Sequence, residues 1–176
     1  MQSDLLIASW ATSVTPAFEE KASLPENITR TEILNFIAEN PGVQFRAICA
    51  GLGLSIGVVQ FHVGQLLKNG LINSNRKGRY KRFFTGNFSR AEIEAISVAR
   101  VGRVRCILKA LLEGKALSHH ELAKRVCISS QGLTWQMNRL QETGFVEETR
   151  EGLKVTYTLK KDWAALVSHA VWLIEN

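Results

Sequence analysis

The fold is decided by the stretch Leu54-Ser-Ile-Gly-Val-Val-Gln-Phe-His-Val-Gly-Gln-Leu-Leu-Lys-Asn-Gly-Leu-Ile72 and its continuation Asn73-Ser-Asn-Arg-Lys-Gly-Arg-Tyr-Lys-Arg-Phe-Phe84. Ser55 is placed to accept a backbone N–H from the following turn, so it marks the start of a helix. Apolar residues recur after it at helical spacing, at Val59, Val63 and Leu66. Gly70 follows, where a left-handed residue ends a helix. These signals predict a helix over 55–69.

After Gly70 the spacing of apolar residues becomes strand-like, and a Lys-Gly-Arg turn reverses the chain. We therefore predict strands over 71–76 and 79–85. A short helix followed by a basic β-hairpin is the layout of a winged helix-turn-helix. In that layout the helix lies in the major groove of DNA and the hairpin, called the wing, reaches along the backbone.

Composition and charge favour a folded protein that binds a polyanion. The 176 residues are 45% hydrophobic, which is enough for a packed core in one domain or two small ones. The net charge of +6 is uneven, because residues 27–90 contain nine Lys or Arg and two Glu, a net +7. A local excess of that size steers polyanions. Apolar runs are too short for a membrane span and a basic signal-peptide start is missing, so we expect a cytoplasmic, nucleoid-associated protein.

The remaining elements follow from capping boxes and breakers. Thr29 and Glu32 fit a capping box that opens a first helix, which stops at Asn40-Pro41-Gly42. A short strand at Val43 and a helix over 44–50 come next. A capping box at Ser89-Arg-Ala-Glu92 predicts a connecting helix, interrupted near Gly102, and another helix is expected over 103–113. A capping box at Ser118-His-His-Glu121 predicts the short helix that follows. Residues 1–26 read as a packed helix or arm, a dimerisation arm or a disordered tail.

The second half repeats the first when the sequence is shifted by 74 residues without a gap. Ser55 then falls on Ser129, Gly70 on Gly144 and Gly78 on Gly152. Caps, core positions and turn glycines match together, so we infer an internal duplication of one fold. A last helix begins at Lys161 and carries an apolar side made of Trp163, Leu166, Val167, Ala170, Leu173 and Ile174. That side either closes the second domain or pairs with another copy.

These patterns predict a mainly α protein with small β-hairpins (α+β), made of two tandem winged helix-turn-helix domains joined by a helix, with terminal helices. The expected boundaries are an N-terminal arm or helix at 1–26, domain one at 27–87, the connecting helix at 88–102, domain two at 103–160 and the C-terminal helix at 161–176.

Residues 55–72 resemble the recognition helix of ArsR- and MarR-like winged-helix transcriptional regulators. The matching positions are Ser55, Val59, His62, Leu66, Gly70 and Leu71, with Gln60 and Val63 departing from the pattern. The second copy matches more loosely and has Gln136 in place of the histidine. The resemblance covers about 30–85 and 103–160. Two winged helices in one chain also resemble the tandem-domain regulators found in archaea. The resemblance implies a DNA-binding regulator, and we expect a homodimer through the terminal helices.

The candidate DNA contacts fall into three sets. The first wing offers Arg76, Lys77, Arg79, Tyr80, Lys81 and Arg82, although alternate residues of a strand face opposite sides. The first recognition helix offers Ser55, Ile56, Gln60, Phe61, Gln65 and Lys68. The second recognition helix offers Ser130, Gln131, Thr134, Trp135, Asn138 and Arg139. Gln and Asn suit adenine, and apolar side chains suit a thymine methyl group.

Alternative readings stay open for each set. The first wing is also consistent with a solvated hairpin, and the apolar outer side of the first recognition helix with a protein interface. The second wing, Glu147-Glu-Thr-Arg-Glu151, is acidic and would repel phosphates. We therefore expect domain one to supply most of the backbone affinity, while domain two adds base contacts or binds a protein.

Enzyme and metal signatures are weak. We find no P-loop, no nucleophile turn and no closely spaced carboxylates, so we expect no enzyme and no cofactor. Cys49, Cys106 and Cys127 read as buried free thiols, with a thiol sensor or metal site as the alternative. His119 and His120 suit a capping or surface role better than chelation, and His62 reads as a satisfied buried histidine. The rival functions are a protein-interaction scaffold in a multisubunit complex and a non-specific chromosome-associated protein.

Overall fold

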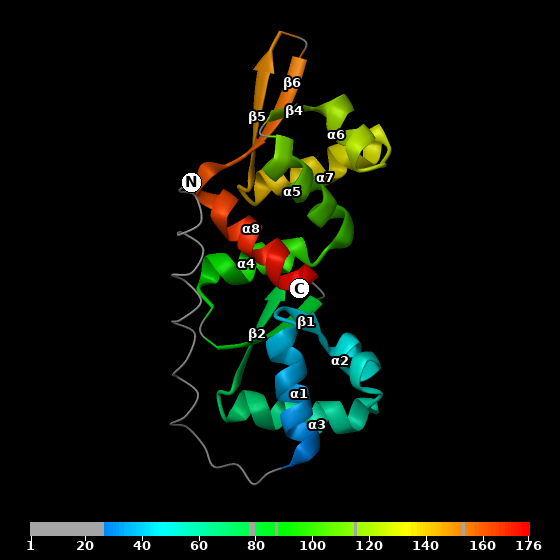
Figure 1. The fold of residues 1–176 in the computed structure, drawn as a ribbon, viewed down its shortest axis with the longest axis vertical. Coiled ribbons are helices and arrows are strands. Elements are labelled where there is room, and N and C mark those ends of the chain that lie inside the picture. Colours follow the sequence, from blue (N-terminus) through cyan, green and yellow to red (C-terminus); the bar gives the residue numbers. More distant parts are fainter. Residues whose placement is uncertain (1–26, 78–79, 87, 115, 153) are drawn as a thin grey trace, which may run out of the picture.

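The structure, a computed structural model, describes residues 27–77, 80–86, 88–114, 116–152 and 154–176 (Figure 1). The predicted N-terminal arm and Arg79 of the first wing lie outside these residues. The first half contains α1 (Ile28–Glu39), β1 (Val43–Gln44), α2 (Phe45–Leu52), α3 (Ile56–Lys68), β2 (Ile72–Lys77), β3 (Tyr80–Thr85) and α4 (Arg90–Ala99). The second half contains α5 (Gly102–Gly114), β4 (Ala116–Ser118), α6 (His119–Arg125), α7 (Ser130–Glu142), β5 (Val146–Glu151), β6 (Lys154–Leu159) and α8 (Lys161–Glu175).

The α+β class with two winged helix-turn-helix units is confirmed, and the element bounds confirm the duplication. A shift of 74 residues carries the bounds of α3 onto those of α7, and those of β2 and β3 onto β5 and β6. The two sheets also share one topology, β1-β3-β2 and β4-β6-β5, with Ile72 opposite Thr85 and Val146 opposite Leu159. The shift further places α4 inside α8, so the repeated unit includes a terminal helix that the sequence comparison did not assign to it.

Local signals explain where the helices begin and end. The Ser55 hydroxyl accepts from the Val58 N–H at 3.5 Å, and the Ser129 hydroxyl accepts from the Gly132 N–H at 3.2 Å. Gly70 follows its helix with a φ of 70°, as expected for a left-handed ending. The capping box predicted at Thr29 is wrong: the helix starts earlier, and the side chain of Asn27 accepts from the Arg30 N–H.

The hydrophobic cores of the two units are not independent of each other. One cluster of buried apolar residues lies within the first unit, and a second joins α4, α5, α7 and α8. Phe84 of β3 is fully buried in the second cluster. Figure 1 shows α4 and α8 side by side between the two units. The first unit therefore contributes a strand residue to the core of the second.

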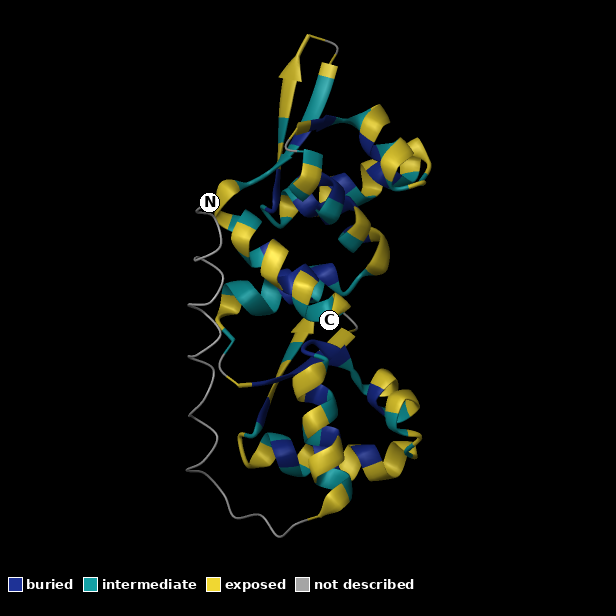
Figure 2. Ribbon diagram, viewed as in Figure 1, coloured by how far each residue is buried: buried dark blue, intermediate teal, exposed yellow. Residues whose placement is uncertain are grey.

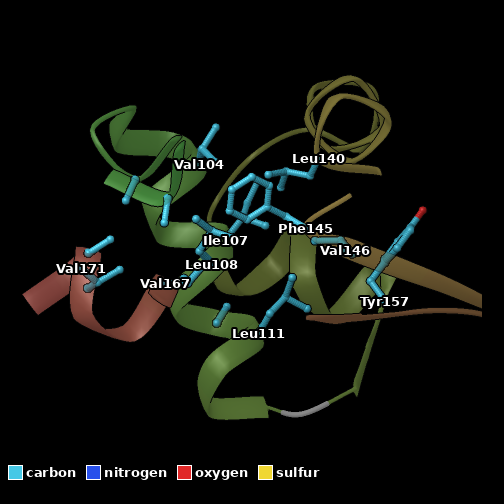
Figure 3. Packing of buried hydrophobic residues seen from close by; sticks show 14 of the residues in the cluster. Val104, Ile107, Leu108, Leu111, Leu140, Phe145, Val146, Tyr157, Val167 and Val171 are labelled. Carbon is cyan, nitrogen blue, oxygen red and sulfur yellow. The ribbon is translucent and has the colours of Figure 1, made fainter. Parts of the chain in front are cut away.

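The C-terminal helix closes this second core. Val167 and Ala170 are buried, and Figure 3 shows Val167 of α8 beside Leu108 of α5 in the buried cluster. The Trp163 ring stacks on Phe145 with centroids 4.1 Å apart. The apolar side of α8 therefore closes the second domain, which is one of the two roles predicted for it; the other was pairing with another copy.

Membrane insertion finds little support in the described helices. No single one of them is long and apolar enough to cross a bilayer; α2 and α3 pass the length and composition test only as a pair bent by 118°. Figure 2 shows buried residues along both of these helices.

The cysteines are free, but the prediction that they are buried is wrong: Cys106 and Cys127 are exposed and Cys49 is half-buried. Cys127 has a φ of 53°, and the shift of 74 residues places it on Gly53, which has a φ of 64°. The two repeats thus share a left-handed helix ending, formed by glycine in the first and by cysteine in the second.

Replacing Cys127 with glycine is expected to raise the free energy of unfolding by about 0.5–1 kcal/mol, because a non-glycine residue is strained in the left-handed region. Urea denaturation followed by circular dichroism would measure this gain. Cys106→Gly is the matched control, because Cys106 lies inside α5 and glycine there should lower stability instead.

Candidate nucleic-acid interface

Helix α3 divides its residues between a core side and an exposed side. Val59, His62, Val63 and Leu66 are buried. Most of the predicted contact residues lie on the other side: Ser55, Ile56, Gln60, Phe61 and Lys68 are exposed, and Gln65 is half-buried. The exposed fractions of Ile56 and Phe61 are 63% and 59%. The helix therefore presents two large apolar groups, one amide and one cation at its surface, which suits a groove better than bulk water.

The first wing divides its cations between two sides. Arg76 lies directly opposite Lys81 in the strand register. Both are exposed, and two residues further along their strands the same side carries Phe83 and Ser74, which are also paired. The Lys81 ammonium lies 5.5 Å from the centre of the Phe83 ring. Phe83 belongs to the core of the first unit, which includes α3. Arg76 and Lys81 therefore lie on the sheet side that belongs to the first recognition helix.

The other side of the wing faces α4. The Lys77 ammonium pairs with Glu94 of α4 at 2.7 Å, and Tyr80 is 51% exposed. Arg82 is only 8% exposed, and its Nη1 donates to the Gly42 carbonyl at 2.9 Å. The prediction that Arg82 contacts DNA is thus contradicted by its burial: the side chain serves the junction between β3 and the Pro41–Gly42 turn.

Helix α7 carries the third predicted set, and all six of its members are exposed: Ser130, Gln131, Thr134, Trp135, Asn138 and Arg139. The Arg139 guanidinium lies over the Trp135 ring, 5.8 Å from its centre. The Thr134 hydroxyl donates to the Ser130 carbonyl and lies 3.2 Å from the His119 Nε2 atom. Gln131, Asn138 and Arg139 remain the strongest candidates for base or phosphate contact.

The second wing keeps its negative charge at the surface. Glu148 accepts hydrogen bonds from Arg150 and from Gln141 of α7, and these bonds hold the pKa of its carboxyl below the usual range. Glu147 and Glu151 are exposed. Because Glu148 is paired with Arg150, the repulsion of phosphate comes from Glu147 and Glu151, which make this wing a poor partner for a DNA backbone.

The structure brings part of the first wing and part of α7 together. Lys77, Tyr80 and Arg82 line one cavity with Trp135 and Arg139. Helix α3 does not reach it. The cavity is completed by residues of α4 and the α4–α5 turn that no site prediction included, notably Ser97 and Arg100. The sequence did carry one signal for this cavity: Arg100 is a charged residue among the apolar residues of the connecting helix.

Metal binding has no support in the described chain. No group of three or more His, Cys, Asp or Glu side chains there is arranged to hold an ion. His119 contacts Thr134, as above, and His120 is exposed at the start of α6.

His62 is buried as predicted, with 7% of its surface exposed, but it is not satisfied: its Nδ1 has no hydrogen-bond partner among the described residues. Burial, followed by the nearby positive charge of Arg30, lowers the pKa of His62 below 6.5. The unfolded chain binds a proton near pH 6.5 and the folded chain resists it. Stability from this histidine is therefore full above pH 6.5 and is lost as the pH falls below it.

We expect His62→Gln, which copies Gln136 of the second repeat, to flatten the decline in stability between pH 7.5 and pH 5. Urea denaturation at the two pH values would measure the slope. His120→Gln should leave the slope unchanged, because His120 is exposed. An unchanged slope in His62→Gln would mean that another group causes the decline.

Family models match both halves of the chain. A model described as an N-terminal HTH domain matches residues 27–96, and a winged helix-turn-helix DNA-binding model matches residues 105–147. The first match runs into α4 and the second covers α7. Together they place a helix-turn-helix in each repeat.

Similar proteins include an uncharacterised HTH-type transcriptional regulator of Methanocaldococcus jannaschii, 24% identical over 143 residues. That match covers 81% of this chain and 36% of the relative, so the chain spans about a third of its length. Among solved structures, the transcriptional repressor BigR from Xylella fastidiosa has a TM-score of 0.42 at 26% identity, covering 48% of this chain and 87% of that one. A MarR mutant from E. coli complexed with operator DNA has a TM-score of 0.40 at 21% identity, covering 49% and 64%.

Proposed function

We propose that this chain, which contains two tandem winged helix-turn-helix domains, is a DNA-binding transcriptional regulator. The observation that carries the proposal is the pairing of an exposed α3 surface with Arg76 and Lys81 on the neighbouring side of the first wing. The family models support it by matching a helix-turn-helix in each half.

In this proposal the first unit supplies most of the affinity for the DNA backbone. Lys68, Arg76 and Lys81 would neutralise phosphates, a sequence-independent contribution that weakens with salt. Gln60 would pair with adenine while Ile56 or Phe61 meets a thymine methyl group. Their exposure on one side of α3 supports this arrangement.

The second unit has a different role, because its wing is acidic. Gln131 and Asn138 on α7 can read base edges, while Glu147 and Glu151 keep the second wing away from phosphates. We propose that α7 contributes sequence readout and that the first wing contributes the backbone contacts.

The proposal is tested by identifying genomic DNA bound to the purified chain and titrating that site against random duplex at two salt concentrations. A regulator should prefer its site by about 10³-fold or more at physiological salt. Equal affinity for both duplexes, with a steep salt slope, would indicate the non-specific chromosome-associated protein instead. Lack of binding to either duplex would favour the scaffold, which the comparisons do not.

Three further predictions accompany the proposal: a regulator rather than an enzyme, a cytoplasmic and nucleoid-associated location, and a homodimer. The dimer now depends less on the C-terminal helix, because Val167 and Ala170 of α8 already pack inside the chain. A second copy would meet the outer side of α8 or the N-terminal 26 residues. Light scattering on the purified protein would measure the oligomeric state.

A further inference from the structure

A cavity of about 490 Å³ lies between the two repeats, lined by the first wing, α4, α5 and α7. Its volume falls within the range of small-molecule sites in proteins. The two repeats contribute through different elements, the first through its wing and the second through its recognition helix. The cavity is therefore a product of the tandem arrangement and would not exist in either unit alone.

Positive charge dominates the polar part of the cavity. Lys77, Arg82, Arg100 and Arg139 line it, and none of its described lining residues is an Asp or Glu. Lys77 is neutralised by Glu94 outside the lining. The three arginines remain, and an anion in the cavity would supply the missing counter-charge.

Two of these arginines are held by neutral groups. Arg82 donates to the Gly42 carbonyl and the Arg100 Nε donates to the Pro41 carbonyl, both at 2.9 Å. Burial is the main reason that the pKa of each guanidinium is lowered, and their mutual repulsion adds to the shift of Arg100. Each of these two neighbouring cations has its own acceptor, and both acceptors are uncharged. The site is therefore incomplete, because a desolvated charge is stabilised best by an opposite charge.

Three residues that line the cavity each have an unpartnered polar atom. Ser97 Oγ, Arg100 Nη2 and Gln136 Oε1 are buried without a hydrogen-bond partner among the described residues, and all three residues line the cavity. Buried polar groups in folded proteins are normally satisfied. Because all three residues line the cavity, small side-chain rotations would let a bound molecule supply the missing partners.

Apart from the neutral polar residues Gln44 and Thr143, the rest of the lining is apolar or aromatic. Val98, Val101 and Val104 come from α4, the following turn and α5, and Leu140 comes from α7. The rings of Tyr80 and Trp135 stand at the wing and at α7. A DNA backbone has no apolar body to place against such residues, so the lining fits a small molecule better than a phosphodiester chain.

We propose that this cavity binds a small amphipathic anion, with its carboxylate or phosphate at Arg82 and Arg100 and its apolar body against the valines and Trp135. The site joins the first wing to α7, so its occupant would fix their relative positions. That consequence for DNA rests on the proposed function; the binding itself does not, and it is measured without DNA.

The test uses two dyes that differ by one sulfonate, the anionic 8-anilinonaphthalene-1-sulfonate and the neutral N-phenyl-1-naphthylamine, titrated by fluorescence. We expect the anionic dye to bind at least tenfold more tightly. Arg100→Met should weaken its binding at least tenfold, whereas Arg103→Met, an exposed arginine outside the lining, should change it less than twofold. Equal affinity for both dyes, or an unaffected Arg100→Met, would overturn the proposal.

Arg100 also donates a hydrogen bond to the Pro41 carbonyl, so Arg100→Met could fail to fold. A second variant keeps the proposal testable in that case. Ser97→Phe fills the cavity and should abolish binding of the anionic dye; full retention would count against the site. Displacement of the dye by octanoate or octyl phosphate supports the proposal, and the stronger competitor identifies the head group. Equal displacement by octanol would overturn it.

Discussion

Reversing the charges of Arg76 and Lys81 to glutamate is expected to weaken DNA binding by roughly 100-fold and to lower the salt slope by about two, because each phosphate contact contributes nearly one to that slope. The two residues are cross-strand neighbours on the side of the first wing that belongs to the first recognition helix. The loss should be similar for the bound genomic site and for random duplex, since phosphate contacts carry little sequence information.

The measurement is fluorescence anisotropy with a labelled duplex at two or more salt concentrations. A matched control reverses two exposed cations in the first turns of α4 and α8, Arg90→Glu and Lys161→Glu. It makes the same change in net charge on two helices instead of on the strands of the wing, so a comparable loss there would show that only net charge matters. Normal affinity in the wing variant would remove the first wing from the interface.

Much of the fold could be predicted from the sequence because its signals are local. Ser55, Ser89 and Ser118 all cap helices as expected, and the boxes at Ser89 and Ser118 are complete. The duplication was visible because caps and turn glycines depend on backbone geometry rather than on the partner they meet. These features survive divergence of the rest of the sequence.

The site was predicted less completely because burial of a long polar side chain depends on distant segments. Arg82 alternates with Lys81 along one strand, and nothing local distinguishes an exposed cation from a buried one. Its partner is the Gly42 carbonyl, 40 residues earlier. Arg100 was missed for the same reason, since its acceptor, Pro41, is 59 residues away. The alternation of side chains along a strand predicted that the cations of the first wing lie on two sides of the sheet. Only the fold shows which of these sides is covered by other segments of the chain.

The Pro41–Gly42 turn is where both distant contacts meet, and Gly42→Val is expected to lower the free energy of unfolding by about 3–4 kcal/mol. Gly42 has a φ of 76°, where a side chain costs about 1–2 kcal/mol. An added Cβ would also lie 2.9 Å from Ile96 Cγ2 and 3.3 Å from the Phe84 ring, in a packed core where extra volume costs about 1–3 kcal/mol.

The chain offers a control that separates these two costs. Gly86 has a φ of 71° and no heavy atom within 4 Å of an added Cβ among the described residues. Gly86→Val should therefore cost only the backbone strain, about 1–2 kcal/mol. Urea denaturation of both variants would give the difference as the contribution of close packing at the junction. Equal losses would mean that Ile96 and Phe84 move aside without cost, and that the turn does not fix the position of the two arginines.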